Sequence, residues 1–510
     1  MSDDELSNNI PELKRLIINQ HNEISEKDIQ LSKKDLLIQE LQDKITLLQR
    51  KQFAPKSEVV SSEELGLFNE VEELDQNTEE DLEEEENAAE KGDQKKKKKK
   101  RTRLPDNLPR KEIIIDLDEK DKICAHDGAV LIKIGEETSE KLVIVPAKAF
   151  VEKTIRNIYG CPCCDESIKT PPAPTTLLPK TMASASLIAY IIIAKFMDGL
   201  PLYRQEAIFA RIGVALTRQT MARWMIQVSQ KLMPLYNLLQ DELLARDYIQ
   251  MDETTVQVLK EDGKKATSKS YMWVRHAPGN IPIVLYDYSP TRSGEVPIEL
   301  LSGFKGRLQA DGYDGYARVC EENKLTRLGC MDHARRKFEE AFKTSGGKDI
   351  GKKGLIFFKA LYKTEERIEK LSPEMKFKIR QEESKIILMD MKKWVDEKRS
   401  KTTPKSVGGK ALNYFFNEYN YLVRYLDDGK LNISNSGVEN KIRPFAIGRK
   451  NWLFSTSVDG AQASAMFYSL IETAKANDLE PFDWLTEILE KLPHAVTVED
   501  YEALLPFQKK

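Results

Sequence analysis

The stretch YIQMDETTVQVL, residues 248–259, determines how the rest of the chain is interpreted. Its β-branched and apolar residues alternate roughly with polar ones, which predicts a β-strand. Asp252 and Glu253 lie in the middle of this strand, where burying a carboxylate is unfavourable. A strand tolerates an acid there when the acid binds a cation or faces a cleft. The stretch therefore predicts a functional site together with the strand.

The segments that follow continue a mixed pattern of strands and helices. The predicted elements are strands over 271–276 and 281–288, a helix over 296–301, and strands over 306–310 and 325–331. The fourth strand ends at Asp311, and the fifth leads into a helix that opens with Asp332 and His333. Three strands, a helix and a strand ending in an acid is a ribonuclease-H-like order, in which the first two acids lie on adjacent strands.

The whole chain is predicted to be a multidomain α+β protein. The expected segments are a coiled coil over 1–50, an acidic and basic linker over 51–103, a zinc-finger-like module over 104–170, a helix-turn-helix-like region over 177–245, a first core part over 246–335, a helical insertion over 336–430, a second core part over 431–460 and C-terminal helices over 461–510. The core is thus expected in two pieces, separated by long charged helices.

Composition excludes several protein classes. The chain has 510 residues, 40% of them hydrophobic and 32% charged, with a formal net charge of −3. This balance indicates a real core under a charged surface. Six cysteines in this length do not form a disulfide scaffold, and no signal peptide is evident, so a reducing cytoplasm is expected. The apolar run at 187–196 is too short to span a membrane.

A heptad repeat opens the chain. Apolar residues recur every seven positions, at Ile10, Ile17, Ile24, Leu31, Ile38 and Ile45. Leu13, Leu41 and Leu48 occupy matching d positions, whereas the middle d positions are polar. This pattern predicts self-association through a coiled coil, and a lone amphipathic helix is the alternative. The following lysine run, 95–100, is either a DNA grip or a solvated tail.

Cysteines mark the next module. Cys161 and Cys164 have the CxxC spacing of a zinc half-site. The opposite half-site reads CAHD, so zinc would take Cys124, either His126 or Asp127, and the two later cysteines. The alternative is a module that keeps its fold without metal, with reduced cysteines as small core residues.

Two helices joined by a glycine-containing turn precede the core. LYRQEAIFAR, 202–211, predicts the first helix, and Thr217 is expected to cap the second, which carries Arg218 and Arg223. A helix-turn-helix places such a second helix on DNA. A helical bundle that only supports the next domain would give the same pattern.

Three acids are candidates for one metal site: Asp252, Asp311 and Glu439. Mg²⁺ and Mn²⁺ prefer oxygen ligands and retain several waters, so a few carboxylates hold them. Two such ions about 3.5–4 Å apart activate a water or a 3′-hydroxyl and stabilise the leaving oxygen of a phosphodiester. Glu253 and Asp314 are rival acids. The alternative is that the three are unrelated surface acids.

Basic and aromatic residues near these acids are suited to DNA. Lys and Arg contact phosphates, and Trp stacks on unpaired bases. The candidates are His333, Arg335 and Arg336 after the fifth strand, and Arg443, Arg449, Lys450 and Trp452 after Glu439. His333 either contacts the scissile phosphate or caps its own helix. Trp273 and Trp224 are expected in the core.

The chain resembles transposases of the insertion sequence 66 family, which have a DDE catalytic core. The resemblance runs from about residue 104 to 493 through LPDNLPRKEI, IGEETSEKLVIVPAK, PLYRQEAIFARIGV, YIQMDETTV, LQADGYDGYARV, CMDHARRKFEEA, ENKIRPFAIGRKNWLFS and YSLIETAKANDLEPFDWLTEILEKLP. It implies a coiled coil, a zinc-finger-like module, a helix-turn-helix and a ribonuclease-H-like core. It further implies Mg²⁺-dependent strand cleavage and transfer at the element's ends by Asp252, Asp311 and Glu439.

The chain departs from the family pattern at two places. CAHD stands where the family has its first CxxC, which puts zinc in question. ISNSGVEN precedes the glutamate where the family usually has an Asn pair followed by AERAIRP or similar. Three functions stay open: a DNA-cleaving enzyme, a silent DNA-binding protein of the same fold, and an enzyme that needs small accessory proteins.

Overall fold

The computed structural model describes residues 10–53, 111, 149–160, 168–344 and 347–507. Most of the linker and the zinc candidates Cys124, His126, Asp127, Cys161 and Cys164 lie outside the described residues. The chain forms two compact units, Met1–Asn69 with Ala173–Lys510, and Glu70–Pro172. The second unit contains a two-stranded antiparallel pair, β1 (Tyr159–Gly160) and β2 (Ile168–Lys169).

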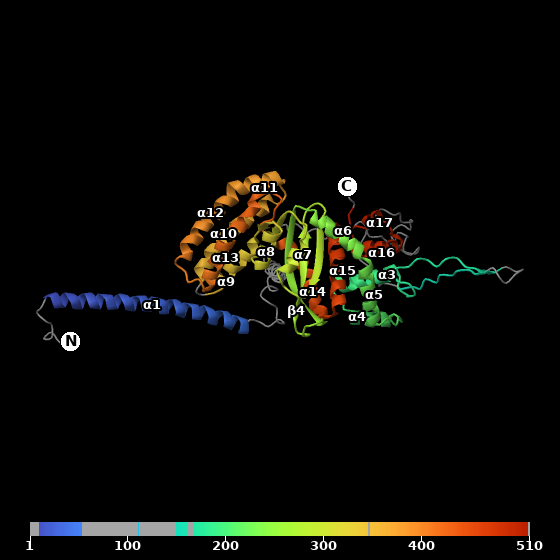
Figure 1. Ribbon diagram of the computed structural model, residues 1–510, viewed down its shortest axis with the longest axis horizontal. Coiled ribbons are helices and arrows are strands. Elements are labelled where there is room, and N and C mark those ends of the chain that lie inside the picture. The colour runs from blue at the N-terminus through green and yellow to red at the C-terminus, as the bar shows by residue number, and fades with distance from the viewer. Residues whose placement is uncertain (1–9, 54–110, 112–148, 161–167, 345–346, 508–510) are drawn as a thin grey trace, which may run out of the picture. The chain divides into compact units, whose positions relative to one another are not determined.

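The larger unit is a mixed helix and sheet structure (Figure 1). Its strands are β3 (Tyr248–Lys260), β4 (Lys269–Ala277), β5 (Ile283–Ser289), β6 (Arg307–Gln309), β7 (Thr326–Leu328) and β8 (Ser455–Ser457). Its helices are α1 (Ile10–Phe53), α3 (Ala185–Phe196), α4 (Leu202–Arg211), α5 (Arg218–Lys231), α6 (Met233–Leu244), α7 (Glu295–Leu300), α8 (Asp314–Glu322), α9 (Met331–Phe342), α10 (Lys348–Ile368), α11 (Pro373–Ile379), α12 (Lys385–Arg399), α13 (Val407–Leu422), α14 (Ser436–Trp452), α15 (Val458–Ala476), α16 (Pro481–Lys491) and α17 (Val498–Glu502).

The six-stranded sheet has the order β5-β4-β3-β6-β7, and β8 pairs with the far end of β3. The first three strands in sequence are antiparallel neighbours, and β6 and β7 continue parallel to β3. The predicted succession of strands and helices is therefore observed. The fifth strand is shorter than the predicted 325–331, because α9 already begins at Met331.

Helix α15 covers the edge strand β5. The hydroxyls of Ser469 and Thr473 accept hydrogen bonds from the backbone N–H of Tyr286 (2.8 Å) and Val284 (3.1 Å). Four residues of helix advance about 6 Å and two residues of strand about 6.6 Å, so both repeats stay in step. The edge groups that a sheet leaves unpaired are thereby bonded within the chain.

A buried ion pair joins β4 to β5. Arg275 is fully buried, and its Nε lies 2.9 Å from Asp287 Oδ2. The guanidinium also donates to the carbonyl of Leu300 at 2.8 Å and to Gln240 Oε1 at 3.2 Å. Tyr236 donates to Asp287 Oδ1 at 2.5 Å, so each member of the pair has further hydrogen bonds.

The helical insertion has its own hydrophobic core. Aromatic rings of α9, α10 and α13 meet there, with Phe338 and Phe358 centroids 5.5 Å apart and Phe338 and Phe415 centroids 6.4 Å apart. Buried residues of α12, such as Met391, complete this cluster. Figure 1 draws the insertion helices on one side of the sheet and α3, α15 and α16 on the other.

The helical region before the sheet follows its predicted boundaries. Helix α4 ends at Arg211, Gly213 has a φ of 82°, and the Thr217 side chain accepts the N–H of Thr220 at the start of α5. Both Arg218 and Arg223 are exposed on α5. Trp224 and Trp273 are buried, as predicted.

Helix α1 contains the heptad repeat. Its apolar residues with described side chains, Ile17, Ile24, Leu31, Ile38, Leu41 and Ile45, are 50–63% exposed. Among the described residues, no helix combines the length and the apolar character needed to cross a membrane.

Candidate functional site

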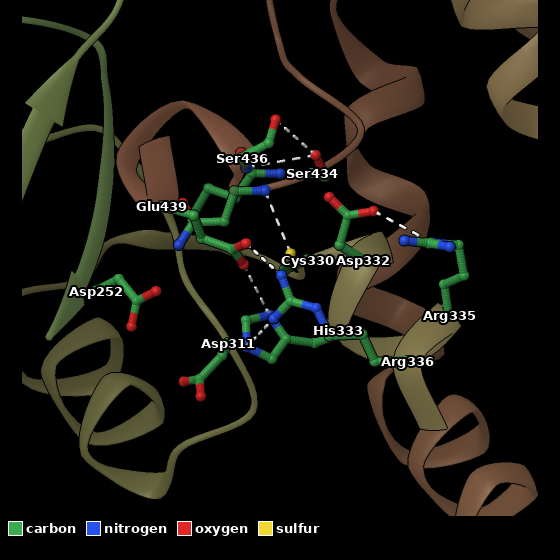
Figure 2. Close-up of polar contacts among 12 residues, drawn as sticks. Asp252, Asp311, Cys330, Asp332, His333, Arg335, Arg336, Ser434, Ser436 and Glu439 are labelled. Atoms are coloured by element: carbon green, nitrogen blue, oxygen red, sulfur yellow. Dashed lines mark hydrogen bonds and ion pairs between the residues drawn. The ribbon is translucent and has the colours of Figure 1, made fainter. Parts of the chain in front are cut away.

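Asp252 lies on β3, and Asp311 follows the end of β6, the strand parallel and adjacent to β3. Gln250 of β3 stands opposite Gln309 of β6, and each aspartate follows its glutamine by two residues. Because the two acids have the same offset from a shared register position, Asp311 leaves the end of β6 close to Asp252, and the two carboxylates interact electrostatically. Figure 2 shows both carboxylates facing one space, next to Glu439.

The charge around Asp252 is unfavourable. Burial raises the pKa of Asp252 well above its usual value, and the carboxylates of Glu253, Asp311 and Glu439 raise it further. Its Oδ1 accepts the backbone N–H of Glu253 at 2.8 Å, which favours the ionised form only in part. Crowded carboxylates of this kind are the environment that a divalent cation relieves.

Glu439 lies in the first turn of α14 and faces α9. Arg336 donates to its Oε2, and His333 Nδ1 lies 3.6 Å from its Oε1. That Oε1 is buried and has no hydrogen-bond partner among the described residues (Figure 2). One oxygen of the Glu439 carboxylate is thus bound by Arg336 of α9, and the other oxygen can still accept a hydrogen bond or bind a cation.

The tightest group of metal-ligand atoms in the described part of the chain is a different one. Atoms of Cys330, His333 and Glu439 all lie within 4.8 Å of one another, and Asp252 and Asp311 are outside this group. Burial raises the pKa of the Cys330 thiol, and its Sγ accepts the N–H of Asn435 at 3.2 Å. This group shares Glu439 with the proposed set of three acids.

Side-chain amides connect the segment before Glu439 to the two strands. Gln309 Nε2 donates to the carbonyl of Asn432 at 2.8 Å, and Gln250 Nε2 donates to that of Ser434 at 3.1 Å. Asn435 Nδ2 donates to the carbonyl of Met251 at 3.0 Å. Asn435 occupies the N-cap position of α14 but makes no side-chain cap hydrogen bond. The sequence analysis missed these contacts, although a glutamine two residues before each aspartate was a visible signal.

His276 fixes the orientation of one of these amides. Its Nδ1 lies 3.2 Å from Gln250 Oε1. Because an amide oxygen only accepts, Nδ1 carries the proton and Gln250 turns its nitrogen toward Ser434. Burial, with a smaller contribution from Lys441, lowers the pKa of His276 from 6.5 to about 4, so the imidazole is neutral.

The low pKa of His276 predicts a pH-dependent stability. The unfolded chain binds a proton below pH 6.5 and the folded chain only below about 4. The contribution of neutral His276 to the free energy of unfolding is fully present above pH 6.5 and is lost as pH falls toward 4. The total loss is at most about 3 kcal/mol. Urea unfolding across this range measures it. His276→Asn keeps a donor but cannot titrate, so its curve should be flatter; an unchanged slope would contradict the assignment.

The rival acids have other surroundings. Glu253 receives hydrogen bonds from Tyr316 Oη at 2.5 Å and from Arg292, so its carboxylate is already engaged. Asp314 is exposed in the first turn of α8. Neither acid is therefore a better candidate for the metal site than Asp252 or Asp311.

The basic residues predicted to contact DNA differ in exposure and in their partners. Arg335 is 41% exposed on α9, 3.7 Å from Asp332, and Arg336 is bound to Glu439. Arg449 donates to Thr254 Oγ1 at 3.2 Å and to the carbonyl of Thr255, which ties α14 to β3.

The remaining candidates also lie on α14. Lys450 is exposed and Arg443 is half-buried. Trp452 packs edge-to-face on Phe196 with centroids 6.0 Å apart, and Lys195 Nζ lies 5.4 Å from its ring. The structure thus gives Trp452 a packing role next to its predicted stacking role.

A groove of about 1600 Å³ lies at the opposite ends of the same strands, where β3 and β6 begin. Basic residues outnumber acidic ones along it: Arg246, Arg307, Lys359, Lys363, Lys376, Arg380 and Lys430 against Asp247, Glu365, Glu366 and Glu369. Ser434 and Ser436, just before Glu439, also line this groove. A polyanion in the groove would therefore lie near the segment that carries the third acid.

Comparison with known proteins identifies the family of the chain. The model of the Transposase IS66 family matches residues 180–463, which include both aspartates, α9 and Glu439. The chain belongs to the IS66 transposase family. Three more models match this transposase: Transposase C of IS166 homeodomain over 40–113, the zinc-finger binding domain of transposase IS66 over 121–165, and the IS66 C-terminal element over 469–507.

Relatives of this IS66 transposase occur in Sinorhizobium fredii (strain NBRC 101917 / NGR234). The uncharacterized protein y4jD is 33% identical over 420 residues, 80% of this chain and 81% of the relative. The uncharacterized protein y4qI is 32% identical over 396 residues, 75% and 73% of the two chains, and y4hP is 30% identical over 425 residues, 80% and 76%. Family membership supports DNA as the partner of the IS66 transposase and a divalent metal as its cofactor class.

Proposed function

We propose that this chain is a DDE-type transposase that binds the ends of its insertion element and catalyses metal-dependent DNA strand cleavage and transfer. The observation that carries the proposal is the register of β3 and β6, which places Asp252 beside Asp311 with the start of α14 next to them. The strand order supports a ribonuclease-H-like core.

The residues fit Mg²⁺ or Mn²⁺. Asp252, Asp311 and Glu439 supply only oxygen donors. Burial, and then the neighbouring carboxylates, raise the pKa of Asp252, and Glu439 has a buried oxygen without a hydrogen-bond partner among the described residues. Bound there, such ions would activate the attacking hydroxyl or water and stabilise the leaving oxygen. Arg336 and His333 lie against Glu439, and in this proposal they would also contact a phosphate of the bound DNA.

Other proposed partners follow from the flanking parts. A second copy of the chain would cover the exposed heptad residues of α1 in a coiled coil. The module with Cys124, Asp127 or His126, Cys161 and Cys164 would add DNA contacts, with Zn²⁺ as its candidate ion. Small accessory proteins remain part of the proposal for full activity.

A second candidate is a catalytically silent DNA-binding protein of the same fold. The orientation of Glu439 toward Arg336 and His333, outside a tight group with both aspartates, favours it. Strand cleavage of DNA carrying the element's ends, with Mg²⁺ or Mn²⁺ and with chelator, separates the two. Cleavage that requires the metal supports the enzyme. Specific binding without cleavage, also after the accessory proteins are supplied, supports the silent protein.

The helix-turn-helix proposal gives a salt-dependent prediction. Arg218 and Arg223 are exposed on α5 and would neutralise phosphates. Each change to alanine should weaken binding to all DNA sequences and reduce the slope of log K against log salt by about 1. Lys491→Ala removes an exposed lysine of α16 paired with Glu487 and should leave the slope unchanged. Equal slopes in all three variants would remove α5 from the DNA interface.

A further inference from the structure

Glu439 lies far from Asp252 in the sequence. Its position relative to Asp252 must therefore be set by contacts across the fold. The buried polar side chains that connect the two regions are Gln250, Gln309 and Asn435, here called the amide cluster, and each is 0% exposed. We propose that the amide cluster positions Glu439 against Asp252 and Asp311 and thereby sets the affinity of the site for divalent metal. This inference rests on the proposed function.

The contacts of the amide cluster cross between the two acid-bearing regions in both directions. Gln250 and Gln309 donate from the strands to carbonyls of the segment before α14. Asn435 donates in return from the start of α14 to the carbonyl of Met251, the residue before Asp252. The spacing between the first turn of α14 and the two aspartates is therefore set by at least three hydrogen bonds.

The glutamines are also bonded to each other. Gln250 Nε2 donates to Gln309 Oε1 at 2.8 Å, and Tyr248 donates to the same oxygen. Gln309 Nε2 further donates to the carbonyl of Gly329 at 3.1 Å, just before α9, which carries Arg336. One connected network thus joins β3, β6, the segment at the start of α14 and Gly329, two residues before α9.

Close packing preserves this arrangement. Gly437 lies against Gln250, and a Cβ at this glycine would be 2.2 Å from Gln250 Oε1 and 3.2 Å from His276 Nδ1. Only a residue without a side chain lets the first turn of α14 approach β3 this closely. Gly437 thus lets the start of α14 pack directly against the Gln250 side chain.

Residues that orient metal ligands without touching the metal typically change its affinity by about 10–100-fold when they are replaced. We expect that range for Gln309→Met, which keeps the shape of the side chain but removes both donors. Gln309→Leu also removes both donors without adding charge, and should have the same effect if the methionine variant fails to fold.

A matched control exists in α4. Gln205 is also buried, and its Nε2 donates to the carbonyls of Ile191 (3.2 Å) and Leu200 (3.0 Å). Gln205→Met likewise removes two side-chain hydrogen bonds to backbone carbonyls, at a position far in sequence from the three acids. A purely structural role predicts equal effects of the two methionine variants on every measurement.

The test measures the rise in Tm that Mn²⁺ causes in the full chain, without DNA, and takes the Asp252→Asn-sensitive part as the signal of the site. The expected result is a shift of about 10-fold or more in the Mn²⁺ concentration needed for half of the rise in Gln309→Met, and no shift in Gln205→Met. Equal Mn²⁺ responses in wild type and Gln309→Met would overturn the inference and leave the proposed function standing. A wild-type response that Asp252→Asn does not reduce would overturn both.

Discussion

Asp252→Asn is expected to abolish metal-dependent strand cleavage, by roughly 10³–10⁴-fold, and at the same time to raise the Tm of the metal-free protein. Burial and the carboxylates of Glu253, Asp311 and Glu439 raise the pKa of Asp252. The folded chain therefore holds its proton more tightly than the unfolded chain, and ionised Asp252 opposes folding. Asparagine fills the same space without this charge.

The sign of the stability effect can be checked with pH. The destabilisation caused by Asp252 begins above the pKa of an aspartate in the unfolded chain and increases until Asp252 is ionised in the folded chain. The Tm of the variant should therefore exceed that of wild type most at neutral pH and least near pH 4. Calorimetry in chelator at both values measures this difference. With added Mn²⁺, wild type should have the higher Tm of the two proteins, because only wild type gains stability from the bound ion.

Asp314→Asn is the control for this experiment. Asp314 is an acid close in sequence to Asp311 but exposed in the first turn of α8. We expect unchanged cleavage and at most a small loss of stability, about 0.3–1 kcal/mol, from the helix terminus. Cleavage retained by Asp252→Asn would exclude Asp252 from the catalytic group.

Arg275→Met is expected to lower the free energy of unfolding by about 3–5 kcal/mol, because it leaves the Asp287 carboxylate buried without its cation. Arg275 is fully buried and contacts β5, α6 and the end of α7 through one guanidinium. Denaturant unfolding measures the loss. The double variant Arg275→Met/Asp287→Leu removes both charges and should recover much of it.

An exposed ion pair provides the comparison. Arg367 and Glu383 are 2.5 Å apart with side chains 59% and 42% exposed. Arg367→Met should change stability by only about 0–1 kcal/mol, because water replaces the lost partner. If Arg275→Met were equally mild, the Arg275–Asp287 pair would not hold β4 and β5 together.

The local pattern was sufficient to predict the strands and the two aspartates. Alternation identified β3, and the stretch GRLQA before Asp311 was predicted as the strand that is observed as β6. Thr217 at the start of α5 and the buried Trp273 were predictable for the same reason, since capping and burial preferences act within a few residues.

Contacts between distant segments were not predictable in this way. The amide cluster depends on pairing Gln250 with Gln309 and then with Asn432 and Ser434, which no sequence period encodes. Trp452 looked like a surface aromatic because it follows basic residues, yet it packs on Phe196. Arg449 similarly contacts β3 backbone. A charged or aromatic residue next to a site can support the site's framework.

The hydroxyls of α15 along β5 have a consequence for assembly. An open sheet margin invites a strand from a neighbouring molecule, and chains with such margins polymerise. Ser469 and Thr473 occupy the outward backbone groups of Val284 and Tyr286, so that margin offers no template to another copy. A strand from a second copy of the chain therefore cannot pair with β5 at these two residues without breaking the bonds from α15.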